Sequence, residues 1–100
     1  MPRAAYSAKA VSDLRDIWLY SANTCGSEQA DQYTDDIQDA CRDLASGRKV
    51  GRVAPERSGY FRFLIARHGV FFVKRGEGIL VMRILHQRMD VARYLDDPEG

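Results

Sequence analysis

The sequence has few residues that could form covalent or metal cross-links. Only two cysteines, Cys25 and Cys41, occur in 100 residues, and they form no Cys-x-x-Cys pair. The two histidines, His68 and His86, lie far from both cysteines in sequence, so we expect no zinc site and no metal cofactor. A disulfide would require an oxidising compartment. Cys41 falls on the apolar face of a predicted helix and is expected to be a small buried hydrophobe.

Long apolar segments are also missing. No run approaches the roughly 18 apolar residues of a membrane span, and the first six residues lack the apolar stretch of a signal peptide. We therefore expect a cytoplasmic protein with no membrane association and no cofactor. The sequence contains no nucleophile elbow, P-loop, HExxH or paired-carboxylate motif, so no enzyme class is indicated.

The charges that are present are unevenly distributed. The length predicts one domain over residues 1–100. The net charge is only +1. Residues 1–46 carry four Lys/Arg against eight acids, a net of −4, and residues 47–100 carry eleven against six, a net of +5. This asymmetry predicts two electrostatic faces but does not identify a partner.

The acidic half has helical periodicity. Residues 3–6 are predicted to form a brief strand, and Ser7 to cap a helix whose apolar positions are Val11, Leu14, Ile17 and Trp18. Gly26 suits a left-handed position after that helix. Ser27 is expected to cap a second helix, with an apolar stripe that runs from Ala30 to Leu44. These two helices predict an antiparallel hairpin.

The basic half is typical of a sheet. Residues 46–59 are predicted to form a basic loop, followed by strands over 60–66, 70–75 and 79–85, a short closing helix over 89–95 and a frayed tail over 96–100. The order β-α-α-β-β-β predicts an α+β fold, with the helical hairpin packed on a small, mainly antiparallel sheet.

Two charged features have both structural and functional interpretations. Asp31, Asp35, Asp39 and Asp43 form an acidic ladder on the second helix. The ladder is either a solvated face or a docking face for a basic partner. Strand alternation places Arg83 on the face of Ile79, Val81 and Leu85. Arg83 is then either snorkelling or paired with an acid such as Asp90, or it contacts phosphate or an acidic protein.

Four motifs in order resemble toxins of the ParE branch of the RelE/ParE superfamily. They are DLRDIWLY at 13–20, GSEQADQY at 26–33, RSGYFR at 57–62 and RILHQRMD at 83–90. Together they cover nearly the whole chain, and the family's fold has the element order derived above. The chain departs from some members at Phe61, where a basic residue is common.

This resemblance implies a function. The protein is expected to be the toxin of a type II toxin–antitoxin system, inhibiting DNA gyrase and blocking replication without being an enzyme. A ParD-like antitoxin is expected to neutralise it by wrapping a flexible segment over its surface. No sequence-specific contact with nucleic acid is expected.

Two other functions remain open. The related RelE branch cleaves messenger RNA on the ribosome with a cluster of basic residues and either a tyrosine or a His/Glu pair, and this chain offers Arg62, Arg83, His86 and Tyr94 in comparable regions. The chain could also be a non-toxic protein-binding remnant of the same fold.

Candidate site residues follow from motif position and charge. For inhibition of the target we select the basic end of the sheet, namely Arg62, Arg83, His86 and Arg88. For antitoxin binding we select Trp18 and Tyr33, whose alternative is burial in the core of the toxin itself, together with Asp35 and Asp39.

Overall fold

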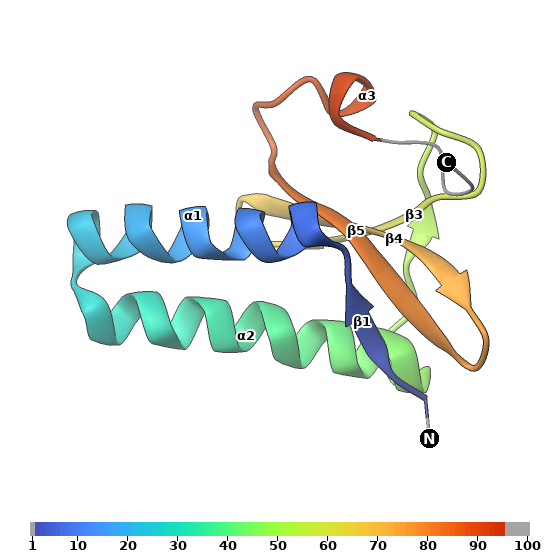
Figure 1. Cartoon of the computed structure of the whole chain (residues 1–100), viewed down its shortest axis with the longest axis horizontal. Helices are drawn as coiled ribbons and strands as arrows, with labels where there is room; N and C mark the ends of the chain where they lie inside the picture. The colour runs from blue at the N-terminus through green and yellow to red at the C-terminus, as the bar shows by residue number, and fades with distance from the viewer. Residues whose placement is uncertain (1, 96–100) are drawn as a thin grey trace.

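The fold is a helical hairpin packed on a five-stranded sheet. A computed structural model describes residues 2–95, so the predicted tail lies outside the described residues. Its elements are β1 (Ala4–Tyr6), α1 (Ala8–Cys25), α2 (Ser27–Ser46), β2 (Arg52–Val53), β3 (Phe61–Ile65), β4 (His68–Arg75), β5 (Gly78–His86) and α3 (Val91–Tyr94). Figure 1 shows α1 and α2 side by side and antiparallel, as the sequence predicted.

The sheet has the strand order β1-β5-β4-β3-β2. Only β1 and β5 pair in parallel, and the other three pairs are antiparallel. The predicted α+β class and mainly antiparallel sheet are therefore confirmed. The two-residue strand β2 was missed, because Arg52 and Val53 lie in a stretch without apolar alternation and are both exposed.

The ends of the helices follow the capping prediction only in part. The Ser7 hydroxyl accepts a hydrogen bond from the Ala10 backbone N–H at 3.0 Å, which confirms the cap of α1. Gly26 has the expected positive φ of 93°, but its ψ of 161° is extended rather than left-handed helical. Gly26 is also the N-cap of α2, so the assignment of that role to Ser27 was wrong.

The sheet is buried on both faces. The helical hairpin covers one face through a core that includes Ile17, Ile37, Cys41, Val70 and Val81. The opposite face packs a second cluster built from Ala54, Tyr60, Phe71, Leu85 and Leu95. Cys41 is fully buried, as predicted, whereas Val11 is 56% exposed and does not belong to the apolar stripe of α1.

A β-bulge in β5 changes the predicted orientation of its side chains. Phe72 pairs with Val81 but Phe71 pairs with Arg83, so Met82 is the extra residue. The Ser7 hydroxyl donates to the Met82 carbonyl at 2.7 Å and so ties the start of α1 to the bulge. Because an inserted residue reverses the alternation, Arg83 does not share a face with Ile79 and Val81, and this part of the sequence prediction was wrong.

Candidate functional site

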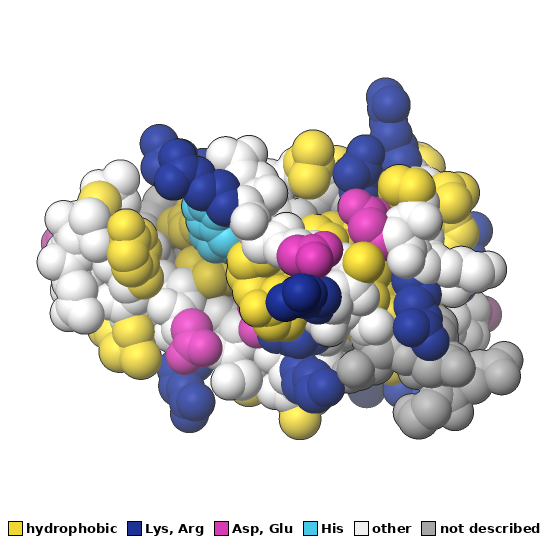
Figure 2. Space-filling model, turned by 90° about the horizontal axis from the view of Figure 1, so that it is seen from above, with side chains coloured by type: hydrophobic (Ala, Val, Ile, Leu, Met, Phe, Trp, Pro, Cys, Tyr) yellow, Lys and Arg dark blue, Asp and Glu magenta, His cyan; other side chains and the backbone are white. Residues whose placement is uncertain are grey.

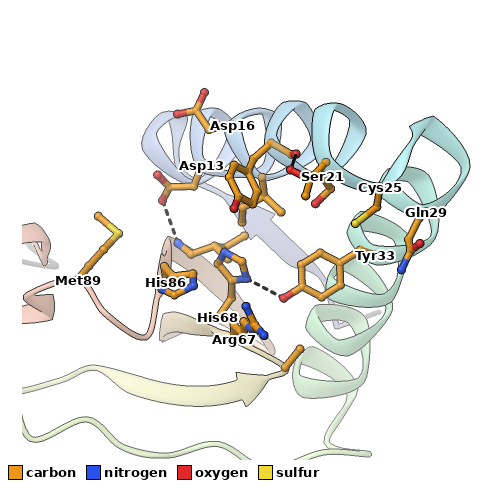
Figure 3. A pocket seen from close by; sticks show the side chains of 15 residues that line it. Asp13, Asp16, Ser21, Cys25, Gln29, Tyr33, Arg67, His68, His86 and Met89 are labelled. Carbon is orange, nitrogen blue, oxygen red and sulfur yellow. Dashed lines mark hydrogen bonds between the residues drawn. The ribbon is translucent and has the colours of Figure 1, made fainter.

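A groove of about 780 Å³ lies where the helical hairpin meets one end of the sheet. Helix α1 and the start of α2 form one side, and the β3–β4 turn and the end of β5 form the other (Figure 3). Its apolar lining includes Ile17, Tyr20, Ala66, Ile84 and Met89, and its polar lining includes Asp13, Tyr33, Arg67, His68 and His86.

Tyr33 and His68 form a hydrogen-bonded pair inside the groove. The Tyr33 hydroxyl lies 2.6 Å from Nδ1 of His68 and donates to the Ile65 carbonyl at 3.3 Å. Both contacts are satisfied when His68 carries its proton on Nδ1 and donates it to the Tyr33 oxygen. Nε2 of His68 is then an acceptor. Tyr33 therefore fixes both the orientation and the tautomer of His68.

The ionisation of this pair reflects its partial burial. Burial lowers the pKa of His68; proximity to His86 lowers it further, and Asp13 acts in the opposite direction. Burial also raises the pKa of Tyr33, against a lowering by the backbone N–H and the guanidinium of Arg67. At neutral pH the groove therefore presents a neutral His68 and a protonated Tyr33.

His86 lies directly opposite His68 in the β4–β5 ladder. The two rings meet edge to face, with centroids 5.3 Å apart. Nδ1 of His86 accepts a hydrogen bond from the Arg88 backbone N–H at 3.1 Å. In the neutral ring of His86 the proton must therefore be on Nε2. Nε2 of His86 is then a donor, whereas Nε2 of His68 is an acceptor.

Asp13 and Arg83 form a nearly buried ion pair next to the groove. Nε and a terminal nitrogen of Arg83 donate to the two carboxylate oxygens of Asp13 at 2.8 and 3.0 Å. One of these oxygens also accepts the Ile84 backbone N–H at 2.9 Å. The side chains are only 15% and 13% exposed. Of the alternatives predicted for Arg83, the structure shows pairing with an acid, but the acid is Asp13 and not Asp90.

Arg83 also holds the C-terminal helix. Its guanidinium donates to the Tyr94 carbonyl at 3.2 Å and lies over the Tyr94 ring, 5.5 Å from the centroid. Asp90 instead pairs with Arg93 at the surface. These contacts give Arg83 a structural role, in which it joins α1, β5 and α3.

Arg62 lies on the other face of the sheet from the helical hairpin. It lines a depression of about 420 Å³ that also includes Glu56, Leu64, Phe71 and His86. One carboxylate oxygen of Glu56 is buried there without a hydrogen-bond partner within residues 2–95. Arg88 is exposed at the adjoining turn. The structure therefore brings Arg62, His86 and Arg88 to one end of the sheet, whereas Arg83 is held by Asp13.

The candidates on the helical hairpin differ in exposure. Trp18 is half-buried and its indole N–H donates to Asp31 at 2.7 Å. Tyr33 is half-buried and packs against the core while it lines the groove. Asp35 and Asp39 are exposed on α2, and Asp39 pairs with Arg42. Part of the acidic ladder is thus bound within the chain.

The roles of Asp13, Arg67 and His68 were not predicted from the sequence. Asp13 opens the first ParE-like motif, but neither that motif nor the sequence around Arg67 and His68 indicates their contacts, because these contacts join residues that are far apart in sequence. Within residues 2–95 no cluster of His, Cys, Asp and Glu is arranged to hold a metal ion. In the same part of the chain no helix is both long and apolar enough to cross a bilayer.

Residues 4–91 match a family described as the ParE toxin of the type II toxin–antitoxin system parDE. The chain is 38% identical over 95 residues to Toxin ParE1 of Mycobacterium tuberculosis, which covers 93% of this chain and 97% of that protein. Toxin ParE1 of Caulobacter vibrioides is 34% identical, with coverages of 89% and 93%. Toxin ParE of Escherichia coli is 31% identical, with coverages of 91% and 90%.

The fold is also found in a solved structure described as the chromosomal ParDE system from P. aeruginosa. The TM-score is 0.75 at 22% sequence identity, and the match covers 86% of this chain and 96% of that one. At this identity the likeness bears on the fold alone.

Proposed function

Because the chain belongs to the ParE toxin family of type II toxin–antitoxin systems, we propose that it blocks replication by inhibiting DNA gyrase and that a ParD-like antitoxin neutralises it. The observation that carries this proposal is the extent of the match, since the chain spans at least 90% of each of the ParE relatives described above. Gyrase acts on DNA in the cytoplasm, which is where we place the toxin.

The geometry favours this function over RNA cleavage. A ribonuclease of the RelE kind would use arginine and tyrosine side chains against the phosphodiester. Here the guanidinium of Arg83 is bound by the Asp13 carboxylate and lies over the ring of Tyr94. Two of the four candidate catalytic residues therefore already have structural partners. We accordingly propose that the protein acts by binding its target rather than as an enzyme.

For gyrase inhibition we propose Arg62, His86 and Arg88 as the contact residues, with Arg83 positioning α3 behind them. The support is their common location at one end of a basic sheet. If alanine at all three left inhibition unchanged in protein with a normal unfolding transition, this assignment would be wrong.

For antitoxin binding we propose the helical hairpin and the groove. Tyr20 lines the groove and is 73% exposed, and Leu19 beside it is 47% exposed. Exposed apolar side chains next to a cavity are typical of protein-binding surfaces. Tyr33 lies inside the groove, and Trp18, Asp35 and Asp39 lie elsewhere on the hairpin. A flexible antitoxin segment that folds on binding could cover all of them.

The test is conditional expression in a bacterial host, with incorporation of labelled thymidine and methionine followed in parallel. We expect thymidine incorporation to stop first, and co-expression of the antitoxin encoded beside the toxin gene to restore growth. Earlier loss of methionine incorporation would favour ribosome-dependent RNA cleavage. Normal growth with the folded protein present would favour the non-toxic remnant.

A further inference from the structure

We infer that the end of the groove formed by Arg67, His68 and His86 is a carboxylate-binding site, which takes an aspartate or glutamate side chain of the antitoxin beside an apolar side chain of the same segment. This inference rests on the proposed function for the identity of the occupant. The chemistry of the site depends on the groove alone.

The donors for a carboxylate are present and are not used elsewhere. Nδ1 of His86 is occupied by the Arg88 backbone N–H, so the ring directs its proton-bearing Nε2 away from that contact. No hydrogen bond from this Nε2 occurs within residues 2–95. Arg67 is exposed, lines the groove, and makes no ion pair in the same part of the chain. An arginine and an imidazole N–H are the usual donors to a carboxylate.

The acids near these donors do not cancel their charge. Asp13 is neutralised by two hydrogen bonds from Arg83. Asp16 is exposed, and Figure 3 shows its side chain on α1 pointing away from the two histidines. Figure 2 shows histidine at the molecular surface beside Lys or Arg side chains, with hydrophobic side chains close by. The local charge therefore favours an anion, and the adjacent hydrophobic side chains favour an apolar group beside it.

His68 becomes a further donor to the carboxylate when its ring is protonated. The N–H at Nδ1 donates a hydrogen bond to the Tyr33 hydroxyl, so a second proton is taken up at Nε2 and leaves this bond intact. The charged and titratable groups that line the groove with His68 include Tyr33 from α2, Asp13 and Asp16 from α1, Arg67 from the turn and His86 from β5, and of these the Asp16 side chain points away from it. A bound carboxylate stabilises the imidazolium. Carboxylate affinity is therefore expected to rise as the pH falls through the pKa of His68.

The first test uses a matched pair of small probes, phenylacetate and phenylacetamide, added to the antitoxin-free protein at neutral pH and followed by the ring NMR signals of His68 and His86. We expect saturable shifts with phenylacetate and at least about tenfold weaker binding of the neutral amide. Arg67→Gln should remove this difference, and Arg75→Gln, an exposed arginine at the far end of the β4–β5 hairpin, should preserve it. Equal affinity for the two probes, or an unchanged Arg67→Gln variant, would overturn the carboxylate site.

The second test identifies the occupant with the full antitoxin and the same variants. We expect Arg67→Gln to weaken antitoxin binding by roughly tenfold or more while Arg75→Gln does not. If the antitoxin binds both variants equally, the proposed function stands and the antitoxin is not the source of the carboxylate. If the antitoxin does not bind the wild-type protein, the proposed function fails, and the phenylacetate result alone decides the chemistry of the groove.

Discussion

The carboxylate of Asp13 binds the guanidinium of Arg83 through both oxygens, and one of these oxygens also caps the Ile84 backbone N–H. Strand β1 pairs with β5 only as far as Val81. Beyond that point the Asp13 side chain from α1 accepts the Ile84 N–H of β5, a bond that a neighbouring strand would otherwise accept. One side chain thereby fixes α1, the bulged strand and the arginine that holds α3.

This relationship predicts a large loss of stability in Asp13→Asn. Removing one partner of a nearly buried pair leaves the charge of Arg83 uncompensated, so we expect the free energy of unfolding to fall by about 3 kcal/mol. Urea denaturation measures the effect. Asp16→Asn, which alters an exposed carboxylate on the same helix, should change stability by less than about 0.5 kcal/mol. Similar losses in the two variants would contradict the structural role of the pair.

Ser7 is predicted to contribute more than an ordinary helix cap. Its hydroxyl accepts from the Ala10 N–H and donates to the Met82 carbonyl at the bulge. Ser7→Ala removes both bonds, so we expect a loss of about 2 kcal/mol, at the upper end for caps. Ser27→Ala is the matched control, since α2 has no side-chain cap. A thermal or urea transition that shifts equally in both variants would show that neither the cap nor the bond to the bulge adds stability.

The lowered pKa of His68 predicts a dependence of stability on pH. The unfolded chain binds a proton at the ordinary histidine pKa of about 6.5, whereas the folded chain resists protonation because His68 is partly buried. Stability is therefore complete above that ordinary value and declines as the pH falls through the lowered pKa of the folded state. His68→Gln should flatten this slope between about pH 7 and pH 5, above the range in which ordinary carboxylates titrate. An identical slope in the variant would assign the effect to other groups.

Asp35 and Asp39 are expected to act through charge rather than through packing, since both are exposed. If they attract a basic stretch of the antitoxin, the double variant Asp35→Asn/Asp39→Asn should bind more weakly, with a flatter dependence on salt concentration. Binding measured over a series of salt concentrations gives both quantities. Glu77→Gln, in the distant β4–β5 turn, controls for net charge. Unchanged affinity in the double variant would leave these aspartates as a solvated face.

The larger elements could be predicted because their signals are local. Residues such as Ile17 and Ile37 repeat at helical spacing, and the run from Val70 to Val73 requires a strand that is buried on both faces. The glycines at 76 and 78 mark the hairpin between β4 and β5. Hydrophobic periodicity and turn chemistry are thus sufficient for the order of the longer elements and for the α+β class, but not for the two-residue strand β2.

The candidate site could not be predicted in the same way because it depends on one inserted residue. With an unbroken register, His68 would face Leu85. The extra Met82 shifts the pairing by one residue, so that His86 lies opposite His68 and Arg83 moves to the other face. The bulge is held by Ser7, which is 75 residues away in sequence. No local pattern near Met82 indicates this contact, and the pairing of Asp13 with Arg83 is equally long-range.

Gyrase inhibition is tested most directly by a supercoiling reaction with purified gyrase, relaxed plasmid and ATP, to which the folded, antitoxin-free protein is added. We predict that supercoiling is inhibited or that cleaved DNA accumulates, and that prior addition of the antitoxin prevents the effect. Full gyrase activity in the presence of excess folded protein would contradict gyrase inhibition and favour the ribosome as the target.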